Sequence, residues 1–127
     1  MVRTVLGVIA GVVAWLVVVT VIDRTMRYFW PDYAAVFAAM TFTLPMMIAR
    51  LAESTVALII ASLVTVRVVP ASRVAPWAFA ILMFVPFAYF HSTIWDKFPI
   101  WYHAFFLGSL IVVPVLVGNL RSRKLAA

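Results

Sequence analysis

Two charged residues lie inside an apolar stretch of this sequence that is long enough to cross a bilayer. Arg50 and Glu53 fall within Pro45–Arg67, where almost every other residue is suited to hydrocarbon. Charged side chains at such depth are rare and usually serve packing or function. Their i, i+3 spacing places both on one helix face, so they can pair with each other. The sequence therefore predicts a buried ion pair or a ligand pocket at Arg50 and Glu53, in the outer third of the membrane.

Two histidines stand near a short turn between two further apolar stretches. His91 and His103 are equally far from the two ends of Trp95–Pro99, so we expect them at similar depths on adjacent helices. With Asp96 or Glu53, two imidazoles would suit zinc or iron, and two imidazoles could also bind a haem axially. Alternatively, the histidines hydrogen-bond water, lipid headgroups or nearby acids. Their wide separation matches no compact ligand motif, so the sequence predicts no cofactor, with a metal or haem as the alternative.

The composition places the chain in a membrane. Of its 127 residues, 67% are hydrophobic and 11% are charged, and no soluble domain of this size could bury that much apolar surface. The net charge of +6 comes from basic residues scattered along the chain, so we expect no nucleic-acid partner. The absence of cysteine excludes a disulfide framework and a thiolate site.

Four apolar segments are long enough to cross a bilayer as helices. They cover about residues 4–22, 45–67, 74–94 and 100–120. The sequence thus predicts a single all-α domain over residues 1–127, an integral membrane four-helix bundle made of two antiparallel transmembrane hairpins. Residues 33–44 carry large side chains at helical spacing. We expect them to form either a separate interfacial helix or an outer extension of the second span.

Basic residues are distributed unevenly between the two ends of the predicted bundle. One end collects Arg3, Arg67, Arg73, Arg121, Arg123 and Lys124. The other end has fewer basic residues, and acidic residues accompany them. By the positive-inside rule, both termini are then cytoplasmic and residues 23–32 and 95–99 lie outside. The predicted location is the cell inner (plasma) membrane, with multiple crossings.

Small residues recur on two of the predicted helices at a spacing that lets helices approach closely. Gly7 and Gly11 form a GxxxG step in the first span, and Ala57 and Ala61 share a face of the second span with Glu53. Because four spans create few internal faces, we expect these residues to contact partner helices. The predicted partners are the lipid bilayer and either further copies of the chain, in a homo-oligomer, or other membrane-protein subunits.

The ionisable groups of the spans fall almost entirely on the predicted outer side. A proton or ion path needs polar groups through the whole membrane depth, which argues against a transporter within one subunit. No P-loop, GxSxG or HExxH motif is present, so a non-enzymatic role is favoured. We predict a structural or accessory subunit of a membrane assembly, with a polar pocket at the outer leaflet. The alternatives are a small transporter and an outer-leaflet enzyme or metal- or haem-binding redox protein that uses Glu53, His91, Asp96 and His103.

Overall fold

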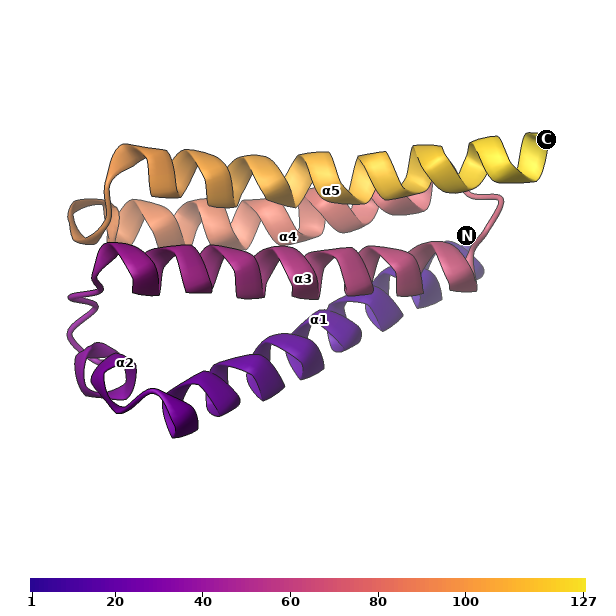
Figure 1. Ribbon diagram of the computed structural model, residues 1–127. Coiled ribbons are helices and arrows are strands. Elements are labelled where there is room, and N and C mark those ends of the chain that lie inside the picture. The colour runs from indigo at the N-terminus through magenta and orange to yellow at the C-terminus, as the bar shows by residue number, and fades with distance from the viewer.

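The computed structural model describes all 127 residues and contains only helices and their connections. The helices are α1 (Val2–Phe29), α2 (Pro31–Val36), α3 (Leu44–Val68), α4 (Val74–Thr93), the 3-10 helix η1 (Trp95–Lys97) and α5 (Ile100–Ala126). The all-α prediction is confirmed: α1 and α3 form one antiparallel hairpin through α2, and α4 and α5 form the other through η1 (Figure 1).

Four of these helices, α1, α3, α4 and α5, are long and apolar enough to cross a membrane. Large apolar side chains cover their outer faces, as Leu6, Ile9 and Val13 do on α1. An outward apolar surface of this extent requires lipid around it. The chain is therefore a multi-pass membrane protein. Both termini lie at one end of the bundle, which we name the termini end, and α2 and η1 lie at the other, the α2 end (Figure 1).

Two helices extend well beyond the spans expected from hydropathy. α1 continues past residue 22 to Phe29 and stops at Trp30, because Pro31 has no amide hydrogen to continue the helical ladder. α5 continues past residue 120 to Ala126, so Gly118 does not end it. Both helices therefore continue, without a break, through basic and polar residues beyond their apolar segments.

The segment expected to be either a separate helix over residues 33–44 or an extension of the second span is a separate helix only in its first part. α2 ends at Val36, a turn follows, and Met40 adopts a positive φ of 55°. Thr43 is extended and caps α3, whose first turn contains Pro45. This reversal folds α2 back over the bundle, and the Tyr33 side chain becomes fully buried.

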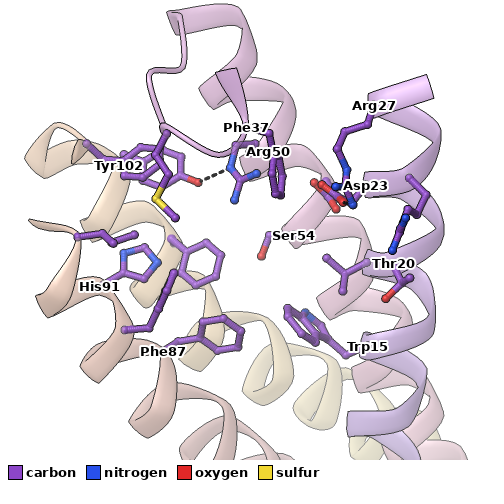
Figure 2. A pocket seen from close by; sticks show the side chains of 18 residues that line it. Trp15, Thr20, Asp23, Arg27, Phe37, Arg50, Ser54, Phe87, His91 and Tyr102 are labelled. Carbon is purple, nitrogen blue, oxygen red and sulfur yellow. Dashed lines mark hydrogen bonds and ion pairs between the residues drawn. The ribbon is translucent and has the colours of Figure 1, made fainter. Parts of the chain in front are cut away.

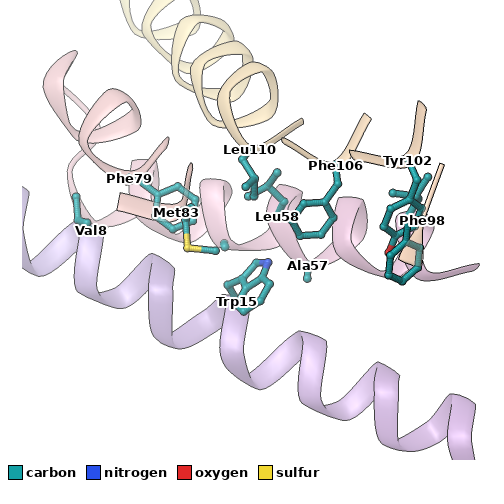
Figure 3. Packing of buried hydrophobic residues seen from close by; sticks show 12 residues of the cluster. Val8, Trp15, Ala57, Leu58, Phe79, Met83, Phe98, Tyr102, Phe106 and Leu110 are labelled. Atoms are coloured by element: carbon teal, nitrogen blue, oxygen red, sulfur yellow. The ribbon is translucent and has the colours of Figure 1, made fainter. Parts of the chain in front are cut away.

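α3 occupies the centre of the packing. α3, α4 and α5 run side by side, whereas α1 crosses them at an angle and diverges from them towards the α2 end (Figure 1). The apolar core follows the middle of the bundle (Figure 3). Its members include Val8 and Trp15 of α1, Leu58 of α3, Phe79 and Met83 of α4 and Leu110 of α5.

The small residues that the sequence singled out are used inside this chain. A side chain on Gly7 would meet Val69, and one on Gly11 would meet Thr65, so α1 lies directly against α3 at the termini end. Ala57 and Ala61 are fully buried on the α3 face. These small residues therefore pack within the chain and give no support to association with further copies or other subunits, which stays a prediction.

Candidate functional site

A cavity of about 360 Å³ lies at the α2 end, where α1 diverges from the other helices. We name it the charged pocket. Side chains from α1, α3, α4 and α5 form its walls, and the turn after α2 covers it. Figure 2 shows α1 and α4 on opposite sides of the space, with Thr20 and His91 facing each other across it. The volume is in the range of ordinary small-molecule sites.

Arg50 of α3 is held in this pocket by two tyrosines. Its Nη1 donates a hydrogen bond of 2.7 Å to the Tyr33 hydroxyl oxygen, and its Nε donates a longer one of 3.4 Å to the Tyr102 hydroxyl oxygen. The guanidinium also lies over the ring of Phe42, 4.7 Å from its centroid. Burial raises the pKa of Tyr33, although the nearby Arg50 charge opposes this shift. Tyr33 therefore accepts the Arg50 hydrogen bond as a neutral hydroxyl.

The expected ion pair between Arg50 and Glu53 is not formed. The structure contains one ion pair, between Arg27 and Asp23 one turn apart on α1. Helix position alone suggested that Arg50 would turn towards Glu53. Instead, hydroxyls from α2 and α5 and the Phe42 ring from the turn after α2 hold the guanidinium elsewhere. Glu53 is only 7% exposed, lines the charged pocket and has no hydrogen bond or ion pair within the chain.

His91 and His103 meet, as their similar depth suggested. Their Nδ1 atoms are 2.7 Å apart, and His103 Nε2 lies 3.1 Å from the carbonyl oxygen of Trp95. The carbonyl can only accept, so His103 carries its proton on Nε2 and accepts at Nδ1. His91 must then donate from Nδ1, which leaves its Nε2 without a partner. His91 lines the charged pocket, whereas His103 does not.

The structure does not assemble the metal site that the sequence allowed. Asp96 is exposed on η1 and lies outside the charged pocket. No group of three or more histidine and acidic side chains is placed to hold a metal ion. Both nitrogens of His103 already make hydrogen bonds, so in this arrangement His103 offers no free lone pair to a metal or to haem iron.

Further polar atoms in the pocket wall have no partner in the protein. Trp15 Nε1, Ser54 Oγ and Arg27 Nε are buried without a hydrogen bond, and all three residues line the charged pocket. Figure 2 shows the Ser54 hydroxyl directed into the space. Buried polar groups are nearly always satisfied, so these atoms indicate a bound molecule or ordered water.

The pocket has a charged end and an aromatic end. Asp23, Arg24 and Arg27 lie at the far end of α1, while Trp15 lies three turns deeper. Trp15 packs edge-on against Phe87, whose ring in turn contacts Phe106. With a rise of ~1.5 Å per residue, the lining on α1 extends over about 18 Å from Trp15 to Arg27. The site can therefore hold a molecule that is polar at one end and apolar at the other.

Sequence reasoning identified some of these residues and missed others. Arg50, Glu53 and His91 were found because ionisable groups are unusual in apolar stretches. Tyr33 and Ser54 were missed: a tyrosine near an interface and a serine in a membrane helix are common, and no local signal distinguishes them. The Asp23 and Arg27 spacing of four residues was a readable signal for their ion pair.

Comparisons of the chain with protein-family models, with curated proteins and with solved structures found no match.

Proposed function

We propose that this multi-pass membrane protein binds an amphipathic, lipid-like molecule in the charged pocket, with the polar part of the ligand near Arg50 and its apolar part near Trp15. The observation that carries the proposal is the polarity gradient of the pocket, from charged side chains at the α2 end to aromatic rings in the middle of the bundle. A purely polar ligand would make no apolar contacts with the aromatic end, and a purely apolar ligand would leave the charged side chains without partners.

The mouth of the pocket supports entry from the bilayer. Three of the residues that line it are also exposed on the outer surface of the bundle: Thr20 and Arg24 on α1 and Phe90 on α4. The opening thus lies between α1 and α4, on a surface surrounded by lipid. Apolar chains of the ligand can remain in the bilayer while its polar part occupies the pocket.

A ligand-binding role also accounts for the site better than a purely structural one. The subunit hypothesis depended on small-residue faces that needed partners, and those faces pack within the chain. An accessory role in an assembly stays open as the context in which the ligand is bound. If the positive-inside reading is correct, the α2 end and the pocket belong to the outer leaflet of the inner membrane.

An enzyme acting on the bound amphiphile is the second candidate. The observation that favours it is that His91 Nε2 and the Glu53 carboxylate, two groups able to accept a proton, both face the same pocket. Asp96 and His103 have no part in this version, because Asp96 lies outside the pocket and His103 is fully hydrogen-bonded. A bound lipid recovered unchanged favours binding alone, and one recovered as cleavage products favours catalysis.

The proposal is tested by purification in mild detergent followed by native mass spectrometry of the intact protein. We expect one lipid-sized molecule retained per chain. A lipid carrying a photoreactive group high on its acyl chain should cross-link to α1 and α4 around Thr20 and Phe90.

Ser54→Leu places a larger, apolar side chain in the pocket wall and should abolish both signals. Ser109→Leu is the matched control, since Ser109 lies on α5 outside the pocket and bonds only its own helix. Absence of a retained lipid, or equal retention by both variants, would overturn the proposed function.

The orientation is tested separately, because the chain has no cysteine of its own. Asp96→Cys, on exposed η1, should react with a membrane-impermeant maleimide in intact cells. Ala127→Cys should react only after the cells are opened. The reverse pattern would place the pocket in the cytoplasmic leaflet.

A further inference from the structure

We infer that the charged pocket recognises a zwitterionic phospholipid headgroup of the phosphoethanolamine type, with the phosphate at Arg50 and the primary ammonium at Glu53. This inference rests on the proposed function and adds the chemistry of the ligand.

Most of the charges at the α2 end are accounted for without a ligand. Arg27 and Asp23 neutralise each other on α1. Arg24 is exposed at the mouth. The two charges left inside the wall are Arg50 and Glu53, one positive and one negative, and neither has an ionic partner in the protein. A ligand that complements them carries one charge of each sign.

Arg50 is organised to receive a phosphate. Its guanidinium is fixed by two tyrosine hydroxyls and has no carboxylate partner, so no acidic side chain compensates its charge. A guanidinium has five donors in a planar fork, so donors remain after the contacts to Tyr33 and Tyr102. Phosphate oxygens match this fork, and Arg24 at the mouth of the same pocket adds positive potential.

Glu53 and its neighbours are organised to receive a donor. The Glu53 carboxylate is an acceptor with no partner in the chain, and the hydroxyl of Ser54, the next residue on α3, has no hydrogen bond. His91 Nε2 presents a further lone pair from α4, on another wall of the pocket. A primary ammonium has three donors and no acceptor, which suits a carboxylate and a hydroxyl that both lack partners. A quaternary ammonium has no donor and would leave the carboxylate unsatisfied.

Arg50 and Glu53 leave α3 at neighbouring positions on one face, which suits a short zwitterion. Residues three apart on a helix have their Cβ atoms about 5–6 Å from each other. The two carbons between the phosphate and the amine of an ethanolamine headgroup are short enough to bridge two such neighbours. The pocket of about 360 Å³ then holds the headgroup and glycerol region, and the acyl chains lie along the aromatic end and in the bilayer.

The test uses lipids with identical dioleoyl chains and different headgroups. Native mass spectrometry measures the affinity of the full chain for phosphatidylethanolamine, its mono- and dimethyl derivatives, phosphatidylcholine and phosphatidylglycerol. We expect phosphatidylethanolamine to bind at least tenfold more tightly than phosphatidylcholine, with affinity falling as each methyl group removes a donor. This series uses the unaltered protein, so it does not depend on the folding of a variant.

Two variants then separate the charges. Glu53→Gln should bring the affinity ratio between phosphatidylethanolamine and phosphatidylcholine close to one. Arg50→Lys should weaken both lipids alike, because both have the phosphate. The matched controls are Asp96→Asn and Lys97→Gln, an exposed acid and an exposed cation outside the pocket, which should change neither affinity.

The outcomes distinguish this inference from the proposed function. A lipid retained in the pocket with equal affinity for the ethanolamine and choline headgroups overturns the headgroup assignment and leaves the binding function standing. Tighter binding of phosphatidylglycerol, or an affinity ratio unchanged by Glu53→Gln, also overturns the headgroup assignment, since Glu53 would then not recognise the ammonium group. Loss of all lipid binding in the unaltered protein overturns both.

Discussion

At the termini end, α1 and α3 touch through Gly7 and Gly11, whereas at the α2 end the same two helices stand apart and help to enclose a cavity of about 360 Å³. The buried hydroxyls differ in the same way. Ser62 and Thr65, towards the termini end, donate to carbonyls of their own helix, while Ser54 at the pocket has no partner. One helix pair thus provides both a tight joint and an open site.

The difference teaches how a small membrane protein can form a pocket without a separate domain. Small residues at one end bring the helix axes together, and the angle between α1 and α3 then separates their other ends (Figure 1). Tyr33 and Arg50 connect α2 to the bundle over this opening. Substitutions at each end therefore test two separate claims, that α1 and α3 are closely packed at the termini end and that a cavity lies between them at the α2 end.

The largest effect is expected at the tight joint. In Gly11→Leu the new side chain would meet Thr65 Oγ1 and, at 3.2 Å, the carbonyl oxygen of Ala61. Thr65 cannot simply rotate away, since its hydroxyl donates to that carbonyl. We expect the free energy of unfolding to fall by about 3 kcal/mol, measured by reversible unfolding in detergent or bilayer.

Gly108→Leu is the control for this substitution, because no atom lies within 4 Å of a side chain added at Gly108 on α5. It should leave the free energy of unfolding nearly unchanged. Equal losses in the two variants would mean that the close approach of α1 to α3 does not determine the effect, since Leu has a higher helix propensity than Gly at both positions.

A smaller effect is expected for the contact that holds α2 over the pocket. Tyr33→Phe removes the 2.7 Å hydrogen bond from Arg50 and leaves a partly buried guanidinium short of an acceptor. Hydrogen bonds to charged groups are worth about 1.5–3 kcal/mol, so we expect a loss near the middle of that range. Tyr28→Phe, at an exposed tyrosine of α1, should cost almost nothing in the same unfolding measurement.

Adding bulk at the open end should cost far less than at the tight joint. Ser54→Leu loses no hydrogen bond, and the new side chain extends into the pocket. Removing a buried polar atom without a partner is favourable, so the free energy of unfolding should stay within about 1 kcal/mol of the wild type. A loss as large as that of Gly11→Leu would show that the α2 end is as tightly packed as the termini end.

A further effect concerns alkaline pH. Burial raises the pKa of Tyr33 in the folded state above its value in the unfolded state. The associated stability is present below the unfolded pKa of about 10 and is lost as pH rises through the folded pKa. The unfolding free energy of the wild type should therefore decline more steeply above pH 10 than that of Tyr33→Phe. Parallel declines would show that Tyr33 does not titrate differently in the two states.

The smallest expected effect concerns which ring nitrogen of His91 and of His103 carries the proton. Nitrogen NMR of labelled protein should find His91 protonated on Nδ1 and His103 protonated on Nε2, because the Trp95 carbonyl can only accept. In His91→Gln, His103 should still prefer the proton on Nε2, though less strongly, because its hydrogen bond to the Trp95 carbonyl remains. Both histidines in the same tautomer would contradict the assignment of His91 Nε2 as a free acceptor in the pocket.

The sequence by itself determined the class of protein and the number of its long helices. Hydropathy is a local property, so apolar runs of sufficient length identify four crossing helices before any tertiary contact is known. Pro31 likewise predicted the end of α1, because proline cannot continue a helix. Hydropathy does not mark the ends of helices that leave the bilayer, which is why α1 and α5 are longer than the predicted spans.

Only the tertiary structure decided which groups meet. Arg50 finds Tyr33 and Tyr102, which are 17 and 52 residues away in the chain, in place of Glu53 one turn along its own helix. Partners at such distances depend on how each helix is rotated and tilted and on the reversal at Met40 that folds α2 back. Spacing within one helix says which residues share a face, but the packing of neighbouring helices determines what that face contacts. This packing gives Arg50 other partners and leaves Glu53 facing the charged pocket.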